Sequence, residues 1–150
     1  ELVHSVDSSS RAIDETNDNV KLNGWNHERH QAFVDDAFRF LERMEEDYDI
    51  IVLDPPAFAK HRDAIRNAMK GYARLNAAAI SRIKSGGIIF TFSCSQAITA
   101  EQFRTAVFTA AARSHRFVKI LHQLHQPADH PVSIYHPEGE YLKGLVLQVE

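Results

Sequence analysis

The segment DPPAFAK at residues 54–60 places an acid and two prolines directly after the apolar run IIVL. Each proline has a fixed φ angle and no N–H group, so this turn is stiff and the preceding carbonyl oxygens stay free to accept hydrogen bonds. A carboxylate beside rigid acceptors can hold an amino group on the edge of a planar ring. Asp54, Pro55 and Pro56 therefore indicate a binding site for a heterocyclic base.

Cys94 is the only cysteine of the chain and lies between two serines, in SCS at residues 93–95. A single thiol excludes a disulfide within the chain, which fits a reducing compartment. A thiolate is a strong nucleophile, so Cys94 could bond covalently to a substrate. A lone cysteine after a strand is more often a small buried apolar residue. The flanking serines and the DPP segment favour the nucleophile.

Asp7, Asp36, Asp54 and Cys94 each lie at or just beyond the end of an expected strand. Ligands of open α/β sheets bind beyond the carboxyl ends of the strands, so these four residues are candidates for one site. An acid there can accept hydrogen bonds from ribose hydroxyls or from the amino group of a base. The alternative is that each Asp caps the next helix. This alternative is weakest for Asp54, because the prolines after it have no N–H group to be capped.

Strand and helix patterns alternate along the chain as far as residue 125. The expected strands are 2–7, 30–36, 49–54, 88–93, 117–125 and 141–149, and the expected helices are 9–22, 37–44, 61–84 and one that begins at the capping box Thr99-x-x-Gln102. This order predicts an α/β fold with a mainly parallel sheet and helices on both faces. The longer loop before the last strand predicts an antiparallel pair, with an antiparallel edge strand, at one side of the sheet.

With 150 residues and 44% hydrophobic content, the chain has the size of one globular domain with a core, and no linker divides it. Its apolar runs are much shorter than the roughly 18 residues of a membrane span. The formal net charge of −3 leaves no overall basic surface, so any nucleic-acid contact must be local or come from another domain. The nine histidines lack the spacing of common metal motifs, so we expect no metal ion.

Positive charges recur at the start of the helix expected at 61–84, at Lys60, Arg62, Arg66, Lys70 and Arg74. A solvated helix face is the simpler interpretation. The alternative is a ridge that contacts phosphates and leads RNA to the site. Phe58 and Tyr72 are candidates to stack on a base, although Tyr72 lies on the apolar stripe of this helix, which favours core packing.

Six segments together resemble the class I S-adenosylmethionine-dependent methyltransferases, and more narrowly the bacterial 23S ribosomal RNA cytosine-C5 methyltransferases. They are VDSSSRAI (6–13), DDAFRFL (35–41), DPPAFAK (54–60), SCS (93–95), DHP (129–131) and HPEGEYLKGL (136–145). That family has a glycine-rich strand-loop and an N-terminal RNA-binding domain before the segment that matches Leu2. The resemblance implies that residues 1–150 are a single, N-terminally incomplete catalytic domain of Rossmann-like fold without its first strand. A missing N-terminal segment or a homo-oligomer partner would complete it.

The resemblance also implies a cofactor and a partner. The cofactor would be S-adenosylmethionine and the partner ribosomal RNA. The protein would act in the cytoplasm, and it would bind neither a membrane nor a metal ion. Asp7 would hold the ribose hydroxyls of the cofactor and Asp36 its adenine amino group. Ser8, Ala37 and Asp54 would lie at the cofactor as well.

The same resemblance assigns the chemistry. Asp54 and the Pro55 carbonyl would grip the target base, and Cys94 would add to C6 of a cytosine. That addition makes C5 nucleophilic enough to take a methyl group, and loss of the C5 proton then releases the enzyme. The remaining substrate contacts would be Pro56, Phe58, Lys60, Arg62 and Arg66.

Two other functions fit the sequence. An enzyme of the same fold that methylates an exocyclic amine would use the DPP carbonyl and no cysteine. In that group an aromatic residue usually follows the prolines directly, whereas here Ala57 precedes Phe58. The third function is a non-catalytic piece, because the chain has no glycine-rich cofactor loop.

Overall fold

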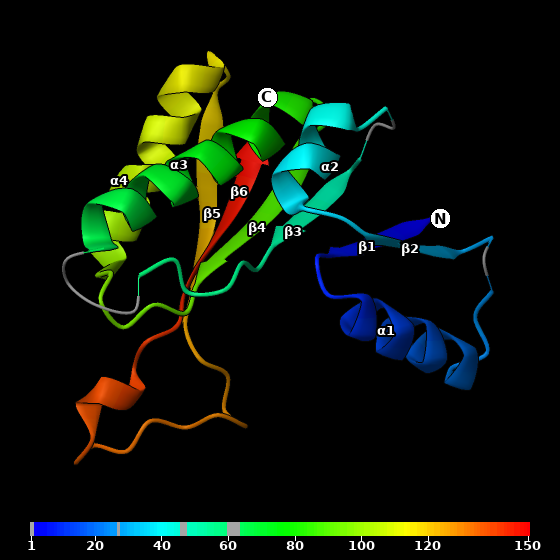
Figure 1. Cartoon of the computed structure of the whole chain (residues 1–150). Helices are drawn as coiled ribbons and strands as arrows, with labels where there is room; N and C mark the ends of the chain where they lie inside the picture. Colours follow the sequence, from blue (N-terminus) through cyan, green and yellow to red (C-terminus); the bar gives the residue numbers. More distant parts are fainter. Residues whose placement is uncertain (1, 27, 46–47, 60–63) are drawn as a thin grey trace. The chain divides into compact units, whose positions relative to one another are not determined.

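The computed structural model describes residues 2–26, 28–45, 48–59 and 64–150. The chain forms two compact units, residues 1–45 and 46–150, each with its own strands and helices (Figure 1). No helix in these described ranges combines the length and the hydropathy that a membrane span requires. The expectation of a single catalytic domain over residues 1–150 stays a prediction.

The first unit is a parallel strand pair with a helix after each strand. Its elements are β1 (Val3–Asp7), α1 (Ser10–Leu22), β2 (His30–Val34) and α2 (Ala37–Arg43). Helix α1 begins where the Ser9 hydroxyl accepts a hydrogen bond from the Ala12 N–H at 3.3 Å, as a capping serine does. It stops before Gly24, whose φ of +72° suits a residue without a Cβ. Strand β2 ends two residues earlier than predicted, because Asp36 turns the chain into α2 as its N-cap.

The two helices of this unit lie on opposite faces of the strand pair (Figure 1). The ring of Phe40 in α2 lies 5.3 Å from the ring of Phe33 and 6.5 Å from that of His4, between centroids, so α2 covers the face that carries these rings. On the other face, the Ser5 hydroxyl and the His30 Nε2 are 2.9 Å apart. Helices on both faces were predicted, and this unit has them.

The second unit is a four-stranded sheet with two long helices. Its elements are β3 (Ile50–Leu53), α3 (Ile65–Arg82), β4 (Gly87–Ser93), α4 (Ala100–Ser114), β5 (Val118–Leu124), the short 3₁₀ helix η2 (Pro137–Gly139) and β6 (Lys143–Val149). The strand order is β3-β4-β6-β5. Strands β3 and β4 are parallel, and β6 is antiparallel to both of its neighbours.

The antiparallel pair therefore lies at one side of the sheet, as predicted, but its reversed strand is not the edge strand. Strand β6 lies between β4 and β5, and the edge is β5. After the loop from residue 125 to 142, the chain turns back antiparallel to β5 and enters the sheet between β5 and β4.

Helices α3 and α4 pack against each other on one face of this sheet and build the core there (Figure 1). Tyr72 and Phe103 are 0% and 1% exposed, and their rings meet edge to face at 5.3 Å between centroids. The predicted capping box at the start of α4 is present: the Gln102 N–H donates to Thr99 Oγ1 at 3.1 Å, and Gln102 Oε1 accepts from the Thr99 N–H at 2.9 Å. This core fixes the ends of β3 and β4, where the candidate site lies.

Candidate active site

Asp54 and Cys94 line the same cavity, of about 400 Å³. The other lining residues are Pro55, Pro56, Gln126, Pro127, His130, Tyr141 and Leu142. The parallel pairing explains the convergence, because Leu53 pairs with Thr91 and both chains leave the sheet at the same edge just afterwards. The two motifs are far apart in sequence, yet strand register alone brings them to one cavity, as the strand-end argument predicted.

The SCS turn is tied to the core and to the DPP segment by its two serines. The Ser93 hydroxyl donates to the Tyr72 hydroxyl at 2.9 Å, and the Ser95 hydroxyl donates to the Ala59 carbonyl at 2.6 Å. Both serines are buried, whereas Cys94 between them is half-buried. The serines therefore hold the turn, and the thiol stays at the cavity wall.

Phe58 points into the core rather than along the cavity wall. Its ring lies 4.7 Å from the Tyr72 ring, between centroids, and a Cβ at Gly71 would meet the Phe58 ring at 3.0 Å. Gly71 therefore lets this ring approach the backbone of α3. Tyr72 packs in the core, as its place on the apolar stripe favoured. The base contact expected of Phe58 stays a prediction, and Phe58 is not among the lining residues.

Burial changes the acidity of the Tyr72 hydroxyl. Burial raises the pKa of Tyr72 above 10.0, its usual value, and hydrogen bonds with Ser93 and the Phe58 backbone oppose part of that rise. The phenol is therefore neutral in the folded chain at neutral pH. Its hydroxyl is fixed between the SCS turn and the DPP segment.

Lys143 reaches the SCS turn from the first residue of β6. It pairs with Ser93 in the sheet, and its Nζ donates to the Ser95 carbonyl at 2.5 Å. Burial lowers the pKa of Lys143, and electrostatic attraction to Cys94 opposes this change. Sequence reasoning gave Lys143 no role, although it lies within the segment HPEGEYLKGL that carried the resemblance.

The loop from residue 125 to 142 supplies the opposite wall, which the strand-end argument missed. The Gln126 side-chain amide donates to the Gly139 carbonyl at 2.7 Å and closes the loop on itself. The His130 Nε2 and the Tyr141 hydroxyl are 3.4 Å apart, with their rings at right angles. The signal for His130 was the DHP segment and that for Tyr141 was the segment HPEGEYLKGL, but nothing in the sequence pattern pointed to Gln126.

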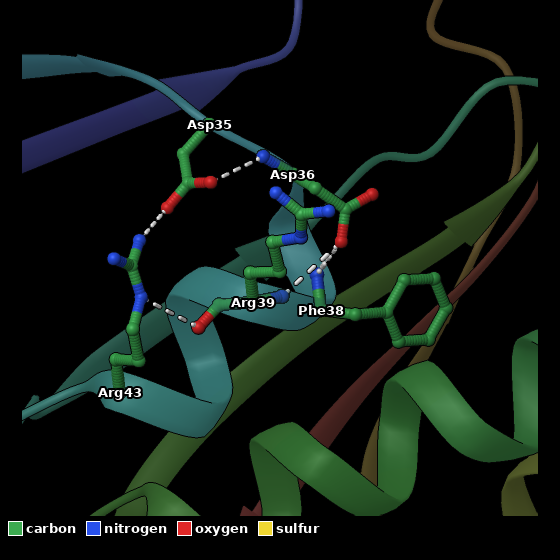
Figure 2. Close-up of polar contacts among 5 residues, drawn as sticks. All are labelled: Asp35, Asp36, Phe38, Arg39 and Arg43. Atoms are coloured by element: carbon green, nitrogen blue, oxygen red, sulfur yellow. Dashed lines mark hydrogen bonds and ion pairs between the residues drawn. The ribbon is translucent and has the colours of Figure 1, made fainter.

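Asp7 and Asp36, the acids expected at the cofactor, follow β1 and β2 and accept hydrogen bonds from nearby backbone N–H groups; Figure 2 shows those of Asp36. Asp36 Oδ1 accepts from the N–H groups of Phe38 at 3.0 Å and Arg39 at 3.1 Å, and Asp7 Oδ1 accepts from the Ser9 N–H at 2.7 Å. In the described part of the chain, no donor contacts Oδ2 of either acid. Asp36 therefore caps α2, whereas Asp7 binds the N–H of Ser9, which is itself the cap of α1. Each carboxylate keeps one oxygen for a ligand.

Asp35 stabilises the turn between β2 and α2. Its Oδ1 accepts from the Asp36 N–H at 2.8 Å, and its Oδ2 forms an ion pair with Arg43 (Figure 2). The Asp35 N–H itself donates to the Asp7 carbonyl at 3.0 Å, which places Asp7 and Asp36 at the same strand ends. Ser8 and Ala37, the other expected cofactor contacts in this unit, are exposed beside them.

Three of the five predicted basic residues fall on described parts of the chain. Arg66, Lys70 and Arg74 recur every fourth residue along α3 and are exposed. Lys60 and Arg62 lie outside the described residues. Within residues 2–26, 28–45, 48–59 and 64–150, no three His, Cys, Asp or Glu side chains gather closely enough to hold a metal ion.

Solved methyltransferases share this fold. SMU.776, a proposed methyltransferase crystallised with SAH, has a TM-score of 0.82 and 24% identity over 99% of this chain and 39% of its own. A proposed SAM-dependent methyltransferase from Streptococcus mutans has a TM-score of 0.81 and 23% identity over 99% of this chain and 38% of its own. The fold is thus the Rossmann-like α/β fold of these proteins, which confirms the predicted fold class.

Curated relatives match the sequence more closely than these structures do. Ribosomal RNA large subunit methyltransferase I of Klebsiella pneumoniae is 39% identical over 150 residues, which are 98% of this chain and 38% of that protein. The protein of the same name from Alteromonas mediterranea gives the same three values. The chain therefore spans 38% of the length of these relatives. No family model matches the chain.

Proposed function

We propose that this chain is the catalytic part of an S-adenosylmethionine-dependent methyltransferase that modifies C5 of a cytosine in large-subunit ribosomal RNA. The observation that carries the proposal is the shared cavity of Asp54 and Cys94. Its volume of about 400 Å³ is in the range of small-molecule sites and suits one base. The relatives at 39% identity are named as ribosomal RNA methyltransferases, which supports the substrate class.

Three of the lining residues, Asp54, Pro55 and Cys94, have roles in this reaction. Asp54 and the Pro55 carbonyl bind the polar edge of the flipped-out cytosine and hold its ring against the thiol, since a base inside a helix cannot be reached. The Cys94 thiolate adds to C6, and the electron pair of the C5–C6 double bond moves so that C5 becomes nucleophilic. S-adenosylmethionine supplies an electrophilic methyl group when bound. Loss of the C5 proton then expels the cysteine and restores the ring.

The residues at the β1–β2 edge suit the cofactor's nucleoside. Asp7 and Ser8 are placed to bind ribose hydroxyls, and Asp36 and Ala37 to bind the adenine edge. The free Oδ2 atoms of Asp7 and Asp36 support this assignment, because each carboxylate is an acceptor whose other oxygen already fixes its orientation. The proposal includes Asp54 as a third cofactor contact.

Replacing Asp36 by serine separates its role as the N-cap of α2 from its proposed role in binding adenine. Serine is also a good N-cap, so α2 is expected to keep its start. Serine is too short and uncharged to reach the adenine amino group, and a hydrogen bond to a charged group is worth about 1.5–3 kcal/mol. We expect the affinity for S-adenosylmethionine, measured by calorimetry on the full-length protein, to fall about tenfold or more.

The matched control is Asp14→Ser, which removes an exposed carboxylate from α1 in the same unit. We expect it to leave the cofactor affinity near the wild-type value. Equal affinities for wild type and Asp36→Ser would remove Asp36 from the cofactor site.

The exposed basic residues of α3 are proposed to contact RNA phosphates. Reversing Arg66 and Lys70 to glutamate is expected to weaken RNA binding. It also makes the plot of log affinity against log salt less steep by about 1.4–1.8, because two counterion-releasing contacts are lost. Arg104→Glu with Arg113→Glu on α4 changes the net charge equally at exposed positions and serves as the control. If both pairs gave the same slope, α3 would have no specific part in RNA binding.

A mechanism-based trap tests the proposed reaction. RNA that carries 5-fluorocytosine cannot lose its C5 substituent, so a covalent complex with Cys94 should accumulate and survive denaturing electrophoresis. Peptide mapping should locate the adduct at Cys94, and Cys94→Ala should give none. Methyl transfer without a trapped complex would instead favour methylation of an exocyclic amine.

The proposal treats residues 1–150 as one catalytic domain made of both units, in the cytoplasm. Comparable structures cover 99% of this chain across both units, which supports this treatment. The relatives are longer, so we propose that a further segment or a second copy contributes to cofactor and RNA binding. A titration of these 150 residues with S-adenosylmethionine, with the oligomeric state measured in the same sample, tests this point, and full binding by a monomer of this chain would contradict it.

A further inference from the structure

Lys143 is fixed beside Cys94 by two separate constraints. Its backbone is held in the sheet by pairing with Ser93, the residue before the cysteine. Its Nζ donates to the carbonyl of Ser95, the residue after the cysteine, at 2.5 Å. The ammonium group is half-buried, so solvent screens its charge less than it would on an open surface.

Among the residues that the structure describes, the other groups that line the cavity or hydrogen-bond to the SCS turn do not supply a fixed positive charge. Asp54 lines the same cavity and, as a carboxylate, disfavours a second negative charge there. Tyr72 lies beneath the turn as a neutral phenol, and His130 and Tyr141 line the cavity from the loop. Among the described residues, Lys143 is the one lysine or arginine that hydrogen-bonds to the SCS turn, and no lysine or arginine lines the cavity.

We propose that Lys143 is the positioning residue that keeps Cys94 reactive, because its ammonium, held on the Ser95 carbonyl, stabilises the thiolate against the negative field of Asp54. This inference rests on the proposed function, since it assigns to the nucleophile the electrostatic partner that this mechanism requires. A thiol is mostly protonated at neutral pH, and a neighbouring cation increases its thiolate fraction. The proton leaves to solvent, and no further reactant is needed.

A purely structural alternative exists, in which Lys143 only fastens the SCS turn through its hydrogen bond. Two substitutions separate these roles. Lys143→Gln keeps a side-chain N–H donor and removes the charge, whereas Lys143→Arg keeps both the donor and the charge. A structural tie predicts similar behaviour for the two variants, and an electrostatic role predicts that only the glutamine variant changes.

The test measures how fast iodoacetamide alkylates Cys94 as a function of pH, read by mass spectrometry on the intact protein. Cys94 is the only cysteine of these 150 residues, and Cys94→Ala gives the background from any other site. We expect Lys143→Gln to react about three- to tenfold more slowly than wild type at pH 7. At high pH we expect this variant to react as fast as wild type, so the curve of alkylation rate against pH moves to higher pH. Lys143→Arg is expected to follow the wild type.

Lys119→Gln on β5 is the control for loss of a lysine elsewhere, because Lys119 forms an ion pair with Glu150. It should leave the profile unchanged. If Lys143→Gln does not fold, acetyl-lysine incorporated at position 143 keeps the aliphatic length and an N–H donor, removes the charge and repeats the comparison. The inference would be overturned if the alkylation rates of wild type and the uncharged variant depended on pH in the same way. It would also be overturned if the arginine variant and the uncharged variant changed this pH dependence equally.

Alkylation needs neither RNA nor cofactor, so it is independent of the trapping experiment. If Lys143→Gln shifts the pH dependence of alkylation but no RNA adduct forms, the proposed reaction is refuted and Lys143 remains the partner of a reactive thiol. An RNA adduct with an undisplaced profile would refute only the role of Lys143.

Discussion

Replacing Cys94 by alanine is expected to lower the rate of methyl transfer to RNA by a factor of about 10³ or more, the scale seen when a covalent nucleophile is removed. C5 of cytosine is a poor nucleophile until a thiolate has added to C6, so the variant loses the step that activates the base. The hydrogen bonds that Asp54 and the Pro55 carbonyl are proposed to accept from the base cannot replace that bond. The measurement is transfer of a labelled methyl group to large-subunit ribosomal RNA by the full-length protein.

The same variant is expected to keep its fold. Cys94 is half-buried, and the hydrogen bonds that hold its turn belong to Ser93 and Ser95 rather than to the thiol. We therefore expect the free energy of unfolding of Cys94→Ala to lie within about 1 kcal/mol of wild type. Turnover retained by a folded Cys94→Ala protein would exclude covalent catalysis. Turnover lost together with the fold would point to a packing role for the cysteine.

Truncating Tyr72 to alanine is expected to cost about 3–5 kcal/mol of folding free energy, as for other buried aromatic residues. The side chain is 0% exposed and packs between the rings of Phe58 and Phe103. Its loss opens a cavity and leaves the Ser93 hydroxyl without its acceptor. Because small domains are stable by only about 5–15 kcal/mol, this change brings the second unit close to unfolding. Urea denaturation followed by circular dichroism measures the difference.

Tyr72→Phe isolates the hydroxyl and adds a pH dependence. Retaining the ring limits the expected loss to about 1–3 kcal/mol, the cost of an unpaired buried polar group. Burial raises the pKa of Tyr72 in the folded chain above its unfolded value of 10.0. The stability linked to this group is therefore complete below about pH 10 and is lost as the pH rises through the folded-state value. Wild type should lose more stability than Tyr72→Phe between pH 8 and about pH 10.5. Parallel losses would mean that Tyr72 titrates normally.

The convergence of Asp54 and Cys94 could be predicted from the sequence because it depends on strand ends alone. Two adjacent parallel strands deliver the residues that follow them to one edge, whatever the details of packing. The capping box at Thr99 and the core position of Tyr72 are equally local, since each depends on spacing within one helix. The capping box and the position of Tyr72 need no knowledge of which distant segments meet, and the convergence needs only that the consecutive strands β3 and β4 are neighbours.

The opposite wall of the cavity could not be predicted in this way. Gln126, His130 and Tyr141 come from an irregular loop with no hydrophobic period that would fix their direction. Lys143 reaches the SCS turn only because β6 enters the sheet beside β4, and that register is set between segments far apart in the chain. The inward position of Phe58 likewise depends on the close approach that Gly71 allows.

The central place of β6 has a consequence for how the protein is made on the ribosome. Strands β4 and β5 are synthesised before β6, yet they meet only through it. Until β6 emerges, both carry unpaired edges, which are prone to pair with other chains. Contacts between distant segments also form slowly, so insertion of β6 is expected to be a late step of folding. Lys143, the proposed electrostatic partner of Cys94, belongs to β6. Until β6 pairs with β4, a nascent chain would therefore carry a thiol without this partner.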